Sequence, residues 1–200
     1  DMFCINSTES HQRAFDIATE ILKRGIKITF KIQVRVDSFK QKDKDLLRYL
    51  KSSGLREVFL GIESGSDDTL RKYRKKATLK DNQEAIDLYN ELGIKVNAGN
   101  ILGAPDSSLE EVLDSIHAFH ELGLTHLLFR RVTTKAVVFP GSELERQLIG
   151  LKLLEAKPRY LLRSYVFKDQ RVGKVTSMME EFTPSFLDTI GGKIFNLRNK

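Results

Sequence analysis

The chain has 200 residues, of which 40% are hydrophobic and 30% are charged, a balance that predicts one soluble, globular domain and excludes an intrinsically disordered chain. The formal net charge of +6 comes from scattered basic residues without aromatic neighbours, so we expect solvated helix faces and neither nucleic acid nor a membrane as partner. The densest basic run, residues 71–76, is typical of a helix end followed by a loop. A single cysteine, Cys4, excludes an internal disulfide framework and indicates a reducing, cytoplasmic setting.

Along the chain, helix-like segments end at a glycine and an apolar, strand-like run follows each of them. Glycine is favoured just past a helix because it has no Cβ to resist a positive φ. These glycines are Gly25, Gly54, Gly93 and Gly123. The predicted strands lie near residues 2–5, 27–36, 57–63, 95–102 and 126–133. This alternation predicts an α/β fold with a parallel sheet, open or closed into a barrel.

Helix positions are indicated by apolar spacing and by capping signals. Two apolar stripes with helical spacing are Ala14, Ile17, Ala18, Ile21 and Leu22, and then Ala85, Ile86, Tyr89 and Leu92. Helix starts are indicated at Thr78-x-x-Asp81 and Ser107-x-x-Glu110, which resemble capping boxes.

The strand near residues 27–36 alternates between apolar and polar side chains. One face carries Ile28, Phe30, Ile32, Val34 and Val36, and the other carries Thr29, Lys31, Gln33, Arg35 and Asp37. A strand buried under helices on both faces would be apolar on both. The polar face therefore predicts a wet, ligand-sized lumen, and an edge strand facing solvent is the alternative.

A glycine motif, Gly99-x-Ile101-x-Gly103-x-x-Asp106, follows the strand predicted at residues 95–102 and precedes a helix start. Glycines alternating with small or apolar residues let a ligand approach the strand backbone, although a close-packed strand and turn is the alternative. The motif lies between two others, GIES at residues 61–64 and VVFPGSEL at residues 137–144.

In this order, the three motifs resemble the radical S-adenosylmethionine (radical SAM) family over residues 1 to about 145. GIES resembles the end of that family's fourth strand, where a polar residue meets the cofactor ribose. The glycine motif resembles the fifth-strand GxIxGxxE motif beside the adenine, and PGSEL resembles the turn after the sixth strand. The likeness is greatest to the cobalamin-associated branch.

The resemblance implies a partial (β/α) barrel with outer helices over residues 1–150, lacking its first strand, followed by a C-terminal extension over residues 151–200. Two departures stand out. Asp106 replaces the usual glutamate, and the CxxxCxxC motif that ligates a [4Fe–4S] cluster is absent. Because one thiolate cannot hold such a cluster, we expect either a fragment of a longer protein or a cluster-free relative.

Five residues are expected to bind the cofactor. Glu63 ends a strand, and its carboxylate can accept two hydrogen bonds from the ribose diol, a structural salt bridge being the alternative. The backbone at Gly99, Ile101 and Gly103 would face the adenine. Arg35 would bind the SAM carboxylate or a substrate anion, or form an ion pair instead.

Two further pairs carry weaker signals. Arg130 and Arg131 alternate on the last predicted strand, so one of them should face the lumen. His117 and His120 lie one helical turn apart without a third ligand, so we expect no metal site there.

The function implied by the resemblance is reductive cleavage of S-adenosylmethionine to a 5′-deoxyadenosyl radical that acts on an unidentified small molecule or peptide. The implied cofactors are SAM, a [4Fe–4S] cluster whose ligands lie outside this chain, and cobalamin bound by a preceding domain. The chain alone is expected to be inactive. A non-catalytic binding or scaffold module and an unrelated phosphate-binding (β/α) barrel are the alternatives.

Overall fold

The computed structural model describes residues 3–124, 135–155 and 164–181. The three strands are β1 (Phe30–Val34), β2 (Leu55–Glu63) and β3 (Lys95–Asn100). The helices are α1 (Thr8–Lys23), the short 3₁₀ helix η1 (Gln41–Asp43), α2 (Lys44–Ser52), α3 (Asp67–Lys72), α4 (Leu79–Glu91), α5 (Leu109–Glu121), α6 (Glu143–Gly150) and α7 (Gln170–Glu181). The strand predicted at residues 126–133, with Arg130 and Arg131, lies outside the described residues.

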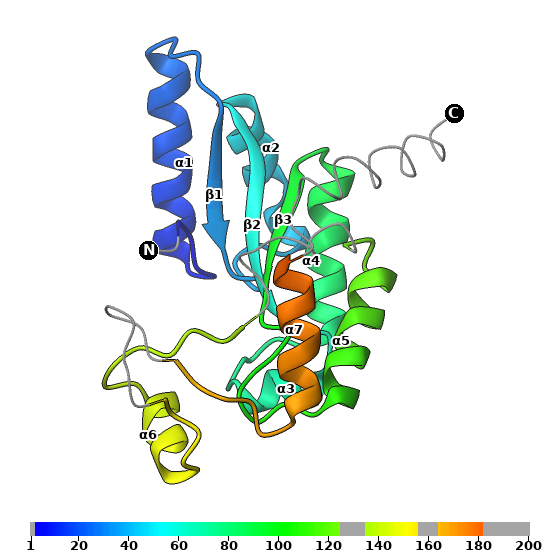
Figure 1. The fold of residues 1–200 in the computed structure, drawn as a ribbon. Helices are drawn as coiled ribbons and strands as arrows, with labels where there is room; N and C mark the ends of the chain where they lie inside the picture. The colour runs from blue at the N-terminus through cyan, green and yellow to red at the C-terminus, as the bar shows by residue number, and fades with distance from the viewer. Residues whose placement is uncertain (1–2, 125–134, 156–163, 182–200) are drawn as a thin grey trace. The chain divides into compact units, whose positions relative to one another are not determined.

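The strands form an open, parallel three-stranded sheet in the order β1-β2-β3, which confirms the predicted α/β class (Figure 1). In the register of β1 and β2, Ile32 lies opposite Val58 and Val34 lies opposite Leu60. On the other side of β1, Cys4 forms an isolated parallel bridge with Val34. This bridge lies where the sequence predicted its first strand, near residues 2–5.

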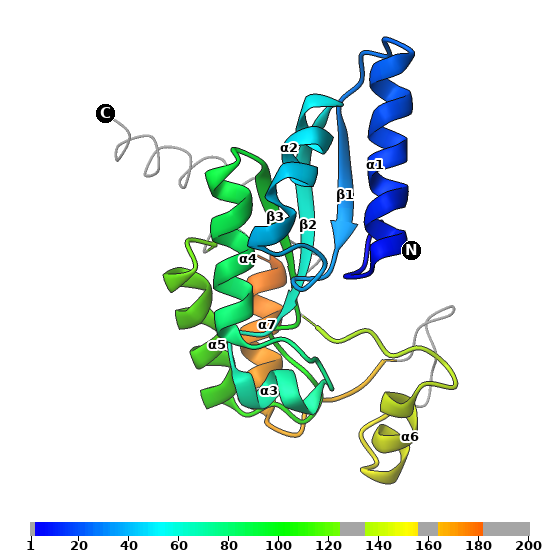
Figure 2. The same ribbon diagram turned by 180° about the vertical axis from the view of Figure 1, so that it is seen from behind.

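The two faces of the sheet differ in burial. Ile32, Leu60 and Val96 belong to the face that is buried, and helices α2 and α4 cover it (Figures 1 and 2). On the opposite face, Lys31 and Gln33 are exposed. The half-buried residues Glu57, Phe59, Gly61 and Glu63 continue that face along β2. The predicted alternation of β1 is therefore confirmed, and its polar face extends onto the neighbouring strand; a closed lumen stays a prediction.

All four predicted helix-ending glycines have a positive φ, between +60° and +121°. At Gly54 a side chain is also excluded by space, because a Cβ there would lie 2.2 Å from the carbonyl oxygen of Ile28. The Thr78–Asp81 capping box is confirmed. The second box is shifted by one residue and joins Ser108 to Glu111.

The shift has a local cause. The hydroxyl of Ser107 accepts a hydrogen bond from the backbone N–H of Ala104 at 2.9 Å and thereby closes the turn after the glycine motif. Ser107 is therefore not available to cap α5, and the next serine takes that role. The predicted pair of Ser107 and Glu110 is wrong by one position.

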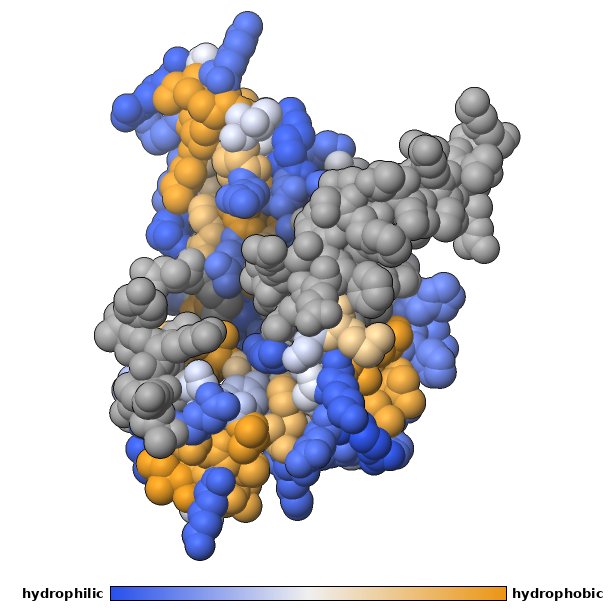
Figure 3. All heavy atoms as spheres, in the orientation of Figure 1, coloured by the Kyte–Doolittle hydropathy of each residue, from blue (hydrophilic) through white to orange (hydrophobic). Residues whose placement is uncertain are grey.

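The apolar stripe of α1 is narrower than its spacing predicted. Ala14 and Ala18 are buried, but Ile17 and Leu22 are 36% and 41% exposed. Leu22 lines one surface hollow together with Ile26 and Ile28, which are also exposed. Figure 3 shows that the first unit carries apolar surface. No described segment fully covers Ile17 and Leu22, so these two residues of the predicted stripe are exposed.

The described residues pack as two compact units, one up to Gly99 and one from Asn100 onward. In the second unit, α7 contacts α5, Gly103 bridges to Lys135, and Leu154 pairs with Tyr165 in an antiparallel bridge. None of the described helices is both long and apolar enough to cross a membrane. The predicted boundary near residue 150 stays a prediction.

Candidate functional site at the end of strand β2

Glu63, the last residue of β2, has a strained backbone. Its φ is +67°, and the backbone N–H of Ser64 donates to the carbonyl of Ile62 at 2.9 Å, which closes a three-residue γ-turn around Glu63. A residue with a Cβ in this region is strained by about 1–3 kcal/mol and persists only where its surroundings hold it. Such residues gather at binding and catalytic sites, so this turn marks the strand end as a candidate site.

The Glu63 carboxylate is held by an ion pair. Its Oε1 accepts a hydrogen bond from Nζ of Lys75 at 2.8 Å, and the two side chains are 21% and 41% exposed. The salt bridge considered as an alternative for Glu63 is therefore present. It does not exclude a ligand, because a carboxylate has about four acceptor positions and Lys75 occupies one.

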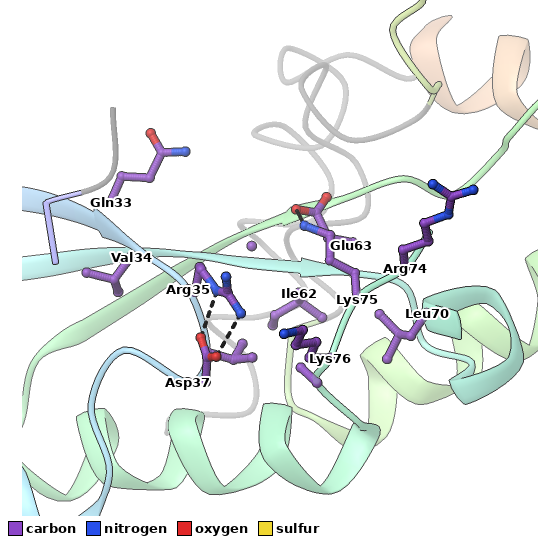
Figure 4. A pocket seen from close by; sticks show the side chains of 13 residues that line it. Gln33, Val34, Arg35, Asp37, Ile62, Glu63, Leu70, Arg74, Lys75 and Lys76 are labelled. Atoms are coloured by element: carbon purple, nitrogen blue, oxygen red, sulfur yellow. Dashed lines mark hydrogen bonds and ion pairs between the residues drawn. The ribbon is translucent and has the colours of Figure 1, made fainter. Parts of the chain in front are cut away.

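Arg35 is also paired. Its Nε and Nη2 donate to Oδ1 and Oδ2 of Asp37 at 2.8 and 2.7 Å, a bidentate arrangement that Figure 4 shows. Both side chains are about one-third to one-half exposed, and exposed ion pairs contribute little free energy. A ligand carboxylate could therefore replace Asp37 at Arg35 with little loss of free energy.

Arg35 and Glu63 line one cavity of about 250 Å³ (Figure 4). The cationic side chains around it outnumber the carboxylates: Arg35, Arg74, Lys75 and Lys76 against Asp37 and Glu63. Gln33 and Gly61 contribute to the same wall. The structure thus brings two of the five predicted site residues together in a polar, positively charged hollow at the carboxyl end of a parallel strand.

The glycines of the Gly99-x-Ile101-x-Gly103 motif are tightly packed. A Cβ on Gly99 would lie 2.9 Å from the ring of Phe59. In the second unit, a Cβ on Gly103 would lie 2.8 Å from Thr176 and 3.1 Å from Phe167. Packing therefore accounts for both glycines, as the alternative interpretation proposed, and their contact with adenine stays a prediction.

The remainder of the motif is less enclosed. Ile101 is half-buried, and Asp106 is exposed beside the buried Pro105. The Pro105 carbonyl accepts a hydrogen bond from the backbone N–H of Lys168 at 2.8 Å, so the C-terminal segment is attached to this loop.

Sequence reasoning missed the roles of Lys75 and Asp37. The run at residues 71–76 is a helix end followed by a loop, as predicted, because α3 ends at Lys72. The signal that could have revealed the role of Lys75 is the position of the basic run. The run spans the end of the one short helix that follows the GIES segment, so the loop after that helix returns to the end of β2.

The residues present do not fit an iron–sulfur cluster. Cys4 is 1% exposed, its Sγ donates to the Ile5 carbonyl and accepts from the Ser10 hydroxyl, and burial raises the pKa of its thiol. Cluster ligation needs several thiolates, whereas this chain has one cysteine. Among the described residues, no group of three or more histidine, cysteine or acidic side chains is arranged to hold a metal ion.

Comparison with known proteins agrees with the motifs. The model of the radical SAM superfamily matches residues 6–119, and the chain therefore belongs to this superfamily. This confirms the resemblance and excludes an unrelated phosphate-binding barrel.

Two curated relatives illustrate how much of the chain is similar to known proteins. An uncharacterized methyltransferase of Pyrococcus horikoshii is 29% identical over 154 residues, which are 77% of this chain and 31% of the relative. The 4′-phospho-dehydrooxetanocin synthase of Priestia megaterium is 34% identical over 106 residues, 48% of this chain and 14% of that enzyme. The chain thus spans a third or less of the length of these relatives.

Solved structures show the same fold. The cobalamin-dependent S-adenosylmethionine radical enzyme OxsB, with aqua-cobalamin and S-adenosylmethionine bound, superposes with a TM-score of 0.73 at 19% identity, over 100% of this chain and 34% of that one. The methyltransferase TsrM from Kitasatospora setae gives a TM-score of 0.54 at 18% identity, over 70% of this chain and 26% of that one. At these identities the likeness establishes the fold, which is part of the radical SAM barrel.

Proposed function

We propose that this chain supplies nucleoside-binding strands of a radical SAM enzyme, in which Glu63 accepts hydrogen bonds from the ribose hydroxyls of S-adenosylmethionine. The observation that carries the proposal is the strained γ-turn, which presents the Glu63 carboxylate to a cavity at the carboxyl end of β2. Ligands of parallel α/β sheets bind at the carboxyl ends of the strands. A vicinal diol offers two donors that match the two oxygens of a carboxylate.

The other site residues have complementary roles in this proposal. Arg35 exchanges Asp37 for the carboxylate of SAM or for an anionic substrate group. The backbone at Gly99, Ile101 and Gly103 contacts the adenine, because glycine has no Cβ to keep a ligand away from the peptide groups. All of these residues bind and orient the cofactor, and none of them reacts.

In this superfamily a reduced iron–sulfur cluster supplies the electron that cleaves SAM, and the single buried thiol of this chain does not fit one. We therefore propose that the chain binds SAM but does not cleave it by itself. OxsB, which shares this fold, is a cobalamin-dependent enzyme, so we propose that the active protein also uses cobalamin, with an unidentified small molecule or peptide as substrate.

The direct test is calorimetric titration of the 200-residue chain with SAM and with 5′-deoxyadenosine. We expect Glu63→Ala to weaken both by about tenfold or more, because a hydrogen bond to a charged group contributes about 1.5–3 kcal/mol. The matched control is Glu57→Ala, since Glu57 lies on the same face of β2 and pairs with Lys95 at 3.5 Å. Equal affinity in wild type and Glu63→Ala would remove Glu63 from the site.

Two further outcomes separate the alternatives. If the wild-type chain binds neither ligand, the proposal fails and a cluster-free scaffold becomes the better explanation. If the chain releases 5′-deoxyadenosine from SAM under reducing conditions, its proposed inactivity is wrong.

A further inference from the structure

We propose that Gly61 and Lys75 are positioning residues that together fix the Glu63 carboxylate for recognition of a ribose diol. This inference rests on the proposed function and explains why the site would select a vicinal diol. Neither residue needs to touch the ligand, because each acts on one and the same oxygen of Glu63, Oε1.

Gly61 provides the space into which the carboxylate folds. Gly61 and Glu63 lie two residues apart on the same face of β2, and a Cβ on Gly61 would lie 2.9 Å from Oε1 and 3.8 Å from the carboxyl carbon of Glu63. Among the described residues, no other atom outside the adjoining residues lies within 4 Å of that point. A Cβ at residue 61 would therefore move the carboxylate, which is the end of a flexible side chain, and leave the backbone of the strand in place.

Lys75 reaches Glu63 from a backbone position that is itself fixed. At the end of α3, the N–H of Lys75 donates to the Leu70 carbonyl and the N–H of Arg74 donates to the Arg71 carbonyl, both at 2.9 Å. This pair of bonds defines a Schellman motif, and Arg74 occupies its left-handed position with a φ of +54°. Two residues with positive φ, Glu63 and Arg74, thus determine where the ion pair forms.

The consequence is a carboxylate held in one orientation before any ligand arrives. Nζ of Lys75 binds Oε1 at 2.8 Å, while Oε2 has no hydrogen-bond partner among the described residues (Figure 4). Oε2 and the second lone pair of Oε1 remain as acceptors on a side chain that lines the cavity. Holding a flexible side chain in its binding conformation removes ordering entropy from the binding step, which raises affinity and selectivity.

The experiment measures selectivity for the diol. Calorimetry gives the affinity of the wild-type chain for adenosine relative to 2′-deoxyadenosine and 3′-deoxyadenosine, and the same ratio for Lys75→Met, Lys75→Arg and Gly61→Ala. We expect the wild type to prefer adenosine by about tenfold or more, since one hydroxyl is lost in each analogue. Lys75→Met and Gly61→Ala should reduce that ratio to about threefold or less, and Lys75→Arg should restore most of it.

Two matched controls separate positioning from general damage. Lys95→Met breaks the comparable ion pair with Glu57 on the same sheet, and Gly150→Ala adds a Cβ that meets no atom of the described residues within 4 Å. Both should keep the wild-type ratio. Circular dichroism melting confirms that every variant is folded. One variant removes an ammonium donor and the other adds a Cβ, so either one suffices as a test if the other does not fold.

The outcomes distinguish this inference from the function on which it rests. A wild-type preference for the diol that survives in both Lys75→Met and Gly61→Ala overturns the positioning role and leaves the proposed function intact. A wild-type chain that binds no nucleoside, or that binds all three equally, overturns the proposed function and this inference with it.

Discussion

The end of β2 and the loop after β3 each carry a glycine where the sequence predicted a ligand, but the space beside the two glycines is filled differently. Beside Gly61 lies the charged end of one side chain, Glu63, which faces a cavity. Beside Gly103 lie three side chains of the C-terminal segment, from Thr176, Phe167 and Val172. The first glycine makes room for a functional group, whereas the second makes room for a packed helix.

This difference shows what a glycine in a motif does and does not indicate. The absence of a Cβ reports that something approaches the backbone closely, and the approaching group can be a ligand, a side chain or another backbone segment. The distinction has measurable consequences, because a Cβ that meets a flexible carboxylate displaces it, whereas a Cβ that meets an interdigitated core strains the fold.

The largest effect on stability is expected for Gly103→Ala. The added Cβ would lie 2.8 Å from Thr176 and 3.1 Å from Phe167, and relieving this overlap should lower the free energy of unfolding by about 1–3 kcal/mol. Urea denaturation followed by circular dichroism measures the change, with Gly150→Ala as the control. Unchanged stability would show that α7 does not pack on the motif, and the contrast with Gly61 would disappear.

A smaller loss, about 1 kcal/mol, is expected for Gly99→Ala, because the Cβ meets the outer edge of the half-buried Phe59 ring, which can turn aside. The reciprocal change Phe59→Leu should recover most of the loss in the double variant, which a double-mutant cycle in urea measures. Strictly additive losses would mean that another neighbour makes Gly99 necessary.

Acid should weaken the first unit through the cap of α4. Hydrogen bonds from Lys40 and Thr78 lower the pKa of Asp81 from 3.8 to about 2. The folded state therefore binds this proton less readily than the unfolded state, and the stabilisation is complete above about pH 4 and is lost as the pH falls toward 2. Asp81→Asn should lower the free energy of unfolding by about 1 kcal/mol at neutral pH. It should also make the free energy of unfolding depend less on pH below about pH 4, which urea denaturation between pH 2 and 6 measures. Parallel profiles for wild type and variant would contradict the assignment.

The smallest effect on stability is expected for Gly61→Ala, within about 0.5 kcal/mol of wild type, since only the tip of a flexible side chain must move. Denaturation under the same conditions as for Gly103→Ala gives the direct comparison. A loss as large as that of Gly103→Ala would mean that Gly61 serves packing, and its role toward Glu63 would be wrong.

Much of the fold was predictable because its signals are local. The four helix-ending glycines, the Thr78–Asp81 box and the alternating burial of β1 each depend on residues that are neighbours in the chain. The capping box of α5 was misplaced by one residue, because Ser107 and Ser108 offer the same chemistry and only the turn formed with Ala104 distinguishes them.

The sequence by itself determined the α/β class, the order of the elements and membership of the radical SAM superfamily, because these follow from periodicity and from motifs in a set order. Only the tertiary structure decided which charges meet. Arg35 pairs with Asp37, and Lys75 folds back from the end of α3 to Glu63. The second pair depends on side-chain directions set by two strained backbone residues, Glu63 and Arg74, whose positive φ values no propensity of glutamate or arginine predicts.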